Sequence, residues 1–258
     1  MDYIENSETP SAGWPVRQLW SSLHYGCTPA ILPIMLLPAT MLLFSGCNGS
    51  GSNGSSSSPQ PVIWLLDNLV QIGGHQPEVH GSPAVVSNSQ MGDALSFDGS
   101  SDGLIMPVNP VEGWDQFTVE VLFWPASSGP EAQRFVHFED ETRNRGLIET
   151  RVTPEGTWTL DTFLYNGETE SGHTLIDHSI QHPADQWYWA ALTYDGRNMK
   201  HFINGVEELA GEIEIGTMGP GKISLGVRQN LVYWYEGLMR EIRFYPEALE
   251  AERLQKPD

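Results

Sequence analysis

FTVEVLFW, residues 117–124, sets the fold class of this 258-residue chain. Its odd-numbered positions carry Phe117, Val119, Val121 and Phe123, whereas its even-numbered positions are mixed in polarity. Successive side chains of a β-strand point to opposite faces, so a period of two places these four apolar residues on one face. The stretch therefore predicts a strand whose strongly apolar face packs against a core.

Similar stretches follow, separated by polar loops. The sequence predicts further strands at residues 134–139, 146–152, 157–165, 187–195, 199–205, 222–227 and 237–245. Asn204-Gly205 is a strong hairpin signal, because both central residues of a type I′ turn need positive φ. Only Pro246–Gln255 has a helical composition. Many short strands at regular spacing predict an all-β fold, a sandwich of two antiparallel sheets with a short C-terminal helix.

Four segments together resemble a known family. ALSFDGSSDGLIMP (94–107), FTVEVLFWP (117–125), QWYWAALTYDGRNMKHFINGVEE (186–208) and YEGLMREIRFYPEAL (235–249) occur in that order. They resemble the laminin-G-like, concanavalin A-like jelly-roll domains over about residues 64–250. The resemblance implies a jelly-roll β-sandwich. Domains of this family serve as sugar-binding modules, protein-binding modules, glycoside hydrolases and polysaccharide lyases, so the fold alone does not give the function.

The closing segment departs from the family pattern at one position. Many relatives carry an aspartate before the closing glutamate, where this chain has Arg240 before Glu241. That aspartate can serve a calcium site in such folds, so the resemblance leaves calcium in doubt and we expect no cofactor.

The N-terminal part carries a targeting signal. Residues 30–44, AILPIMLLPATMLLF, have no charge but are short for a bilayer span, which needs about 20 apolar residues. The segment that follows, Phe44-Ser45-Gly46-Cys47, resembles the lipobox of bacterial lipoproteins, with Phe44 where leucine is usual. The alternative is a cysteine that happens to end an ordinary signal peptide or anchor.

The resemblance to the lipobox implies cleavage before Cys47 and acylation of its thiol, as with palmitate. We expect residues 1–46 to be a lipoprotein signal peptide whose true start lies nearer Arg17, because signal peptides begin positive. Residues 47–61 would be the lipidated cysteine and a Gly/Ser-rich tether, which behaves as a random coil. Residues 62–258 would be one jelly-roll domain in the cell envelope, at the outer membrane or cell surface.

Charge and cysteine content exclude several functions. The formal net charge is −20, with 13 basic and 33 acidic residues. Such a chain repels phosphate backbones, so we expect no nucleic-acid partner, and membrane contact only through the lipid anchor. Cys27 and Cys47 are the only cysteines. The predicted domain after Cys47 therefore has no disulfide and no cysteine-based zinc site.

A cluster of polar residues on three consecutive predicted strands is the main candidate site. Its members are His137 and Glu139, then Glu149 and Arg151, then Asp161 and Tyr165. Within each strand the residues share a face, but a four-residue loop at 153–156 would place Asp161 on the opposite face from Arg151. A one-residue change in register reverses this. The cluster is either a solvated face of an acidic protein, a polar groove for a sugar, or a catalytic site.

Two more candidate ligand contacts lie near the C-terminus, Arg228 and Trp234, in a segment where aromatic side chains with polar edges could stack on sugar. His173, His178 and His182 share one segment without the spacing of a helical metal site, so we expect them in loops or on the surface.

The charged cluster suggests how catalysis could work, although no residue is assigned as catalytic. A glycosidase needs two carboxylates, which Glu149 with Asp161 or Glu139 could supply. A lyase needs a cation and a base, for which Arg151 with His137 or Tyr165 has the right chemistry.

The sequence thus predicts a lipid-anchored envelope protein whose jelly roll binds carbohydrate or another extracellular ligand. The alternatives are a polysaccharide-degrading enzyme on the same fold and a protein–protein adhesion module. We expect a binding protein rather than an enzyme. Because an unpaired buried charge is costly, Glu149, Arg151 and Asp161 should be exposed in a hollow or paired across strands.

Overall fold

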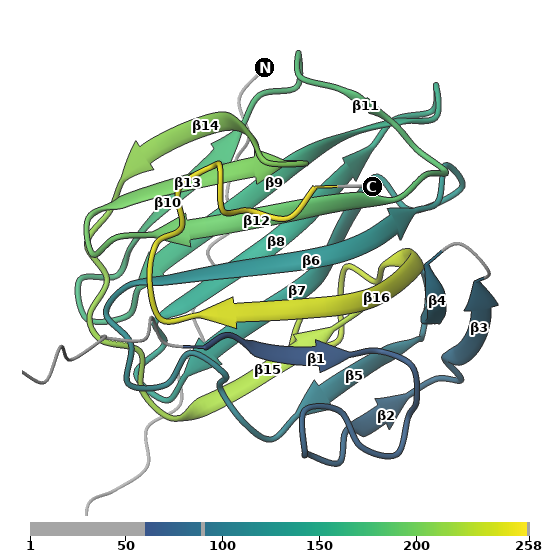
Figure 1. The fold of residues 1–258 in the computed structure, drawn as a ribbon, viewed down its shortest axis with the longest axis horizontal. Helices are drawn as coiled ribbons and strands as arrows, with labels where there is room; N and C mark the ends of the chain where they lie inside the picture. Colours follow the sequence, from purple (N-terminus) through teal and green to yellow (C-terminus); the bar gives the residue numbers. More distant parts are fainter. Residues whose placement is uncertain (1–59, 89–90, 257–258) are drawn as a thin grey trace, which may run out of the picture. The chain divides into compact units, whose positions relative to one another are not determined.

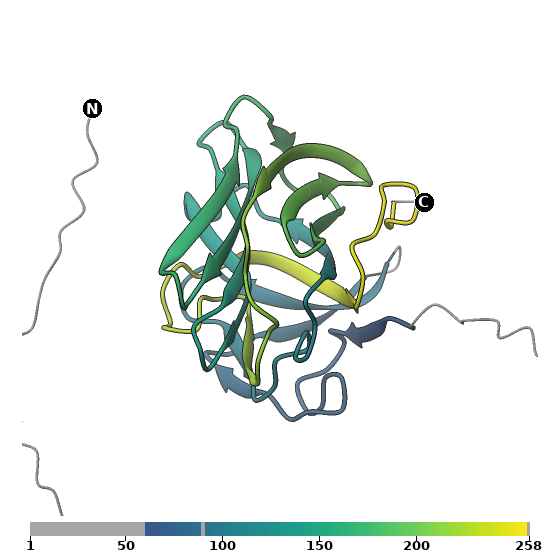
Figure 2. The same ribbon diagram turned by 90° about the vertical axis from the view of Figure 1, so that its left-hand side faces the viewer.

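The computed structural model describes residues 60–88 and 91–256. This part of the chain forms two antiparallel β-sheets of eight strands each (Figure 1). The two sheets pack face to face as the two layers of a sandwich (Figure 2). The all-β jelly-roll prediction is therefore confirmed. The apolar run 30–44 and Cys47 lie outside the described residues.

Sheet I runs in the order β14-β13-β12-β6-β16-β4-β3, with β1 pairing beside β4 on the same side of β16. Its strands are β1 (Val62–Leu65), β3 (Ala84–Asn88), β4 (Gly92–Asp98), β6 (Phe117–Pro125), β12 (Tyr188–Tyr194), β13 (Asn198–Ile203), β14 (Val206–Glu212) and β16 (Glu236–Tyr245).

Sheet II runs in the order β10-β9-β8-β7-β15-β5-β2, with β11 pairing to the other end of β9. Its strands are β2 (Glu78–His80), β5 (Gly103–Met106), β7 (Ala132–Asp140), β8 (Arg145–Val152), β9 (Thr157–Asn166), β10 (Ser171–Ile176), β11 (His182–Pro183) and β15 (Gly221–Leu225).

The core lies between the inner faces of the two sheets. The four apolar residues predicted to share a face of β6 all lie in it with no exposed surface. Phe123 stacks on Phe135 of sheet II with ring centroids 4.7 Å apart, and meets Trp158 edge to face at 5.2 Å. Offset and edge-to-face aromatic pairs add stability beyond the area they bury. The alternation of one strand therefore predicted the centre of the core.

The hairpin prediction at Asn204-Gly205 is also confirmed. Strand β13 ends at Ile203 and β14 begins at Val206, and the two turn residues have φ of 52° and 74°. Positive φ at both positions is what a type I′ turn requires, and its twist matches that of the flanking strands.

The predicted helix at 246–255 is wrong: residues 60–88 and 91–256 contain no helix. The segment instead crosses the outer face of sheet I as an irregular strap (Figure 2), where Leu249 and Leu254 are buried. Two β6 side chains hold its backbone, because Thr118 accepts from the Leu249 N–H and Glu120 from the Gln255 N–H. A helix this short is marginal by itself, so these tertiary contacts decide its conformation. No stretch of the described chain forms a helix capable of spanning a membrane.

Candidate functional site

The turn between β8 and β9 decides which residues share the outer face of sheet II. It holds five residues, because Val152 pairs with Trp158, and the Thr153 N–H donates to the Thr157 carbonyl at 2.8 Å. Arg151 therefore lies opposite Thr159, one residue away from the register of a four-residue loop. The expectation drawn from the shorter loop is wrong, and Asp161 shares the outer face with Glu149 and Arg151.

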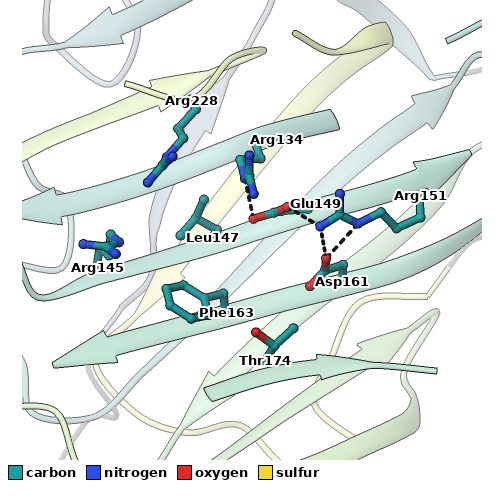
Figure 3. Close-up of a pocket in the computed structure, with 9 residues that line it drawn as sticks. All are labelled: Arg134, Arg145, Leu147, Glu149, Arg151, Asp161, Phe163, Thr174 and Arg228. Atoms are coloured by element: carbon teal, nitrogen blue, oxygen red, sulfur yellow. Dashed lines mark hydrogen bonds and ion pairs between the residues drawn. The ribbon is translucent and has the colours of Figure 1, made fainter. Parts of the chain in front are cut away.

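Four charged side chains form a connected network on this face (Figure 3). Glu149 and Asp161 are directly opposite each other across β8 and β9. Arg151 bridges them: its Nη2 lies 2.5 Å from Asp161 Oδ2 and 3.2 Å from Glu149 Oε2, and its Nε donates to Asp161 at 2.9 Å. Arg134 of β7 holds the other oxygen of Glu149 at 2.8 Å. The predicted cross-strand pairing of the charged residues is thus confirmed.

Burial shapes the electrostatics of this network. Glu149 and Asp161 are only 3% and 2% exposed. Burial, with the negative charge of Asp161 as a second cause, raises the pKa of Glu149 above its usual range. The two arginines oppose this shift through their positive charge and hydrogen bonds. Two carboxylates this close and this buried stay ionised only where cations compensate them.

The network borders a hollow of about 230 Å³. The cross-strand pair Leu147 and Phe163 lies between the acidic residues and a second group of arginines (Figure 3). The hollow therefore combines apolar side chains with charged ones, the mixture typical of small-molecule sites. Its lining residues are Arg134, Arg145, Leu147, Glu149, Arg151, Asp161, Phe163, Thr174 and Arg228.

Two of these arginines lie away from the acidic pair. The guanidinium of Arg145 lies 3.9 Å from the ring centroid of Tyr165 and 5.7 Å from that of Phe163. The predicted site residue Tyr165 thus positions an arginine, and it does not line the hollow. Arg228 reaches the hollow from the loop that follows β15 (Figure 3).

The buried side chain of His137, on β7, contacts the backbone of this loop. Its side chain is 1% exposed, and its Nδ1 accepts the backbone N–H of Gln229 at 3.1 Å. Because Nδ1 accepts this hydrogen bond, the neutral ring carries its proton on Nε2, which lies 3.0 Å from Glu139 Oε2. Burial lowers the pKa of His137 and favours this neutral form. His137 therefore does not line the hollow; it holds the backbone of the loop next to Arg228.

The aromatic segment before β16 is arranged differently from the expectation. Trp234 does not line the hollow; it lies against Gly103. Tyr233 is 45% exposed, and its ring stacks under the Arg134 guanidinium at 3.8 Å. Leu231 and Tyr233 both have φ of 60°, so the segment is not a strand. Alternation cannot assign faces in such a backbone: Tyr235, two residues after the exposed Tyr233, is fully buried, and Tyr233 does not line the hollow.

Arg134 and Arg145 were missed as site residues. Strand β7 has a bulge between Arg134 and Val136, so Phe135 and Val136 both enter the core and Arg134 shares the outer face with His137. A bulge changes the facing of side chains without a clear sequence signal. Arg145, by contrast, follows the simple alternation Arg145, Leu147, Glu149, Arg151 along β8. That period of two could have identified it.

A second hollow of about 650 Å³ shares one lining residue, Arg151, with the first. It is lined by Ser127, Ser128, Gly129, Glu131, Arg151, Val152, Thr153, Pro154, Glu155 and His178. Arg151 therefore borders both hollows, which we refer to together as the depression.

The three histidines of segment 173–182 lie apart from one another. His178 is exposed in a turn, as expected, whereas His173 and His182 are partly buried on strands β10 and β11. His182 Nε2 lies 2.6 Å from Glu208 Oε1, and its ring packs on Trp158. No group of three histidine, cysteine or acidic side chains in the described residues could hold a metal ion.

Comparison with solved structures shows the same fold in domains of diverse origin. Domain 4 of an extracellular arabinanase from Geobacillus stearothermophilus, in complex with arabinotriose, matches with a TM-score of 0.55 and 21% identity, over 74% of this chain and 94% of that domain. The receptor-binding domain of botulinum neurotoxin D matches with a TM-score of 0.54 and 15% identity, over 74% and 50%. The binding domain of Paraclostridial mosquitocidal protein 1 matches with 0.55 and 14%, over the same shares.

At these identities the likeness establishes the fold, and this chain spans about half the length of the two toxin domains. No curated protein sequence matches significantly. The family model described as "Concanavalin A-like lectin/glucanases superfamily" matches residues 98–255, which is more than half of the chain. This match includes the strands that build the hollow, and the sandwich has the corresponding fold. The chain therefore belongs to the concanavalin A-like lectin/glucanase superfamily.

Proposed function

We propose that this domain binds a carbohydrate chain in the depression on the outer face of sheet II. The observation that carries the proposal is the hollow itself, where Leu147 and Phe163 lie beside a rigid set of charged hydrogen-bonding groups. Sugars present both apolar C–H faces and hydroxyl edges, so a site that binds them needs both kinds of surface. The match to a domain in complex with arabinotriose supports the same chemistry.

The dimensions of the depression favour an oligosaccharide over a single sugar. The first hollow, at about 230 Å³, is smaller than the roughly 300–1,000 Å³ of typical ligand pockets, so it suits one sugar ring. The second hollow, at about 650 Å³, is also bordered by Arg151 and would hold the next sugar rings of the same chain.

A glycan array probed with the purified protein tests this proposal, followed by calorimetry on the best ligand. Phe163→Ala removes an apolar wall of the hollow and should weaken binding about tenfold, since stacking and apolar contact contribute roughly 1–1.5 kcal/mol. Val206→Ala, at a 67% exposed position on sheet I, is the control and should bind normally. Equal affinity of the two variants would contradict the assignment of the site.

Hydrolysis of the bound chain is a second candidate, favoured by one observation. Glu149 has a raised pKa and lies directly across from Asp161. Two carboxyl groups with different proton affinities are what a glycosidase uses as acid and nucleophile or base. The arginines that hold both carboxylates favour binding over catalysis. Mass spectrometry of a glycan incubated with the wild type or with Glu149→Gln tests this candidate. Shortened glycan products from the wild type alone would establish hydrolysis.

We also propose that Cys47 carries a lipid that anchors the domain in the cell envelope. The support is the sequence around it, an apolar run followed by a small-residue cysteine motif and a Gly/Ser tether. Cys47→Ala should move the protein from the membrane to the soluble fraction or stall its processing. Cys27→Ala removes the other thiol and should leave fractionation unchanged. Unaltered, detergent-dependent fractionation of the Cys47 variant would refute the anchor.

A further inference from the structure

Arginines gather in the hollow out of proportion to the composition of the protein. The chain has 13 basic residues and a net charge of −20, yet four of the basic residues line this one hollow. They are Arg134, Arg145, Arg151 and Arg228, and the only acids in the lining are Glu149 and Asp161. The lining therefore carries an excess of two positive charges on a strongly acidic protein.

Only two of these four arginines form ion pairs with the acidic residues of the hollow. Arg134 and Arg151 hold Glu149 and Asp161. The side chains of Arg145 and Arg228 make no hydrogen bond or ion pair with any residue in 60–88 or 91–256. Nε of Arg145 is buried without an acceptor, and so is Nη1 of Arg134. Buried donors without acceptors are uncommon in folded proteins, and water or an anion in the hollow could supply the acceptor.

The remaining nearby acid does not fill this role. Glu139 is the register partner of Arg145 across β7 and β8. Its carboxylate, however, contacts His137 at 3.0 Å and forms no ion pair with Arg145 or Arg228 within 4.0 Å. Glu139 therefore weakens the local positive potential without occupying the donors of the two arginines.

The side chain of Arg145 and the backbone of the loop that carries Arg228 are held in place by contacts within the fold. The Arg145 guanidinium lies over the rings of Tyr165 and Phe163. The loop carrying Arg228 is fixed by the Gln229 side chain, which donates to the carbonyls of His137 and Lys222 at 3.1 and 2.9 Å. Figure 3 shows both guanidinium groups at the end of the hollow away from Glu149 and Asp161. Donors fixed in this way lose little conformational entropy on binding.

We propose that Arg145 and Arg228 form a subsite for an anionic substituent of the bound glycan, a uronate carboxylate or a sulfate ester. This proposal rests on carbohydrate binding as the proposed function. Guanidinium groups pair with both anions through charge-assisted, often bidentate hydrogen bonds. The anion would supply the acceptors that the two arginines lack, and Leu147 and Phe163 lie beside it to contact the sugar ring.

Matched pairs of trisaccharides test the subsite by calorimetry on the full-length protein. Each acidic trisaccharide, built from galacturonate, glucuronate or sulfated galactose, is compared with its carboxyl-reduced or desulfated counterpart. The variants are Arg145→Gln and Arg228→Gln, which keep a polar side chain, and Arg197→Gln is the control because its exposed ion pair with Glu212 is remote from the hollow. Circular dichroism melts of all variants verify folding.

The subsite predicts that at least one acidic trisaccharide binds more tightly than its neutral counterpart, with an affinity that falls as salt rises. Each hollow variant should lose about tenfold or more of this affinity, because a hydrogen bond to a charged group is lost, and should bind the neutral form as the wild type does. Equal binding of acidic and neutral forms, or acidic binding unchanged in both variants, would overturn the subsite and leave carbohydrate binding intact. Failure of every trisaccharide to bind would overturn both.

Discussion

Replacing Arg151 by alanine should destabilise the fold, because this residue holds two buried carboxylates together. Its guanidinium contacts both Glu149 and Asp161, which are 3% and 2% exposed. Without it, Glu149 keeps Arg134 as a partner, whereas Asp161 loses its only arginine. The two carboxylates then face each other across neighbouring strands with half of their compensating charge removed.

The magnitude follows from the burial of the three groups. Removing one partner of a buried ion pair costs about 3–5 kcal/mol, because a buried charge is left uncompensated. The Arg151 side chain is 26% exposed, and water can partly replace it, so we expect the lower end of that range, about 3 kcal/mol at pH 7. For a domain of this size, that loss lowers the melting temperature by roughly 6–12 °C.

The assay is urea unfolding followed by tryptophan fluorescence, because Trp158 is fully buried and reports loss of the core. Adding Asp161→Asn to Arg151→Ala removes the orphaned charge and should restore about 1–2 kcal/mol. The deficit should also shrink as pH falls, since Glu149 has a pKa already raised by burial and by Asp161 and protonates early. A loss below about 1 kcal/mol, with no recovery in the double variant, would show that solvent screens the network.

Three further outcomes test other parts of the fold. Burial lowers the pKa of His201 from 6.5 to about 4, with the charge of His182 as a second cause. The unfolded chain therefore binds a proton that the folded protein does not. The free energy of unfolding should fall by up to about 3 kcal/mol as pH drops from 6.5 to 4, and by less in His201→Gln. Equal losses in the two proteins, measured by urea titration at each pH, would refute this. Gly226→Ala should destabilise by more than about 1 kcal/mol in thermal melts, because its φ is 77° and a Cβ would lie 2.3 Å from the Phe97 ring; an unchanged melt would mean that the loop relaxes freely. Calcium or a chelator should leave the melting temperature unchanged, and a shift would reveal a cation site.

Much of the fold could be predicted because its strands repeat one simple pattern. The alternation in β6 identified a strand and its buried face, and Asn204-Gly205 identified a hairpin, since both depend on local backbone geometry. The predicted helix failed because its segment is held by Thr118 and Glu120, which lie more than a hundred residues away. Composition carries no information about such distant partners.

The candidate site was predictable in some of its charged residues but not in its arrangement. Charges at Glu149, Arg151 and Asp161 interrupt apolar strands, which marks them as paired or exposed in a hollow. Whether they meet depended on one residue in the 153–157 turn, and period-two side chains change face with every such step. The sequence identified three of the four charged residues of the network and left their geometry open for this physical reason.

The outer faces of the two sheets differ, and this difference is the reason for proposing the binding site on sheet II. On sheet I the strap at 246–255 covers the centre, and the β6 side chains there hold its backbone (Figure 2). On sheet II the outer faces of β7, β8 and β9 line the hollow, with Arg134 on β7, Arg145 and Arg151 on β8, and Arg228 on the loop after β15. A charged, partly buried network beside a hollow adds little to stability, because apolar residues of similar size would stabilise the strands as well or better. That small contribution to stability supports the proposal that the network serves a ligand, and the arginines at its edge without ion-pair partners are the reason for proposing an anionic one.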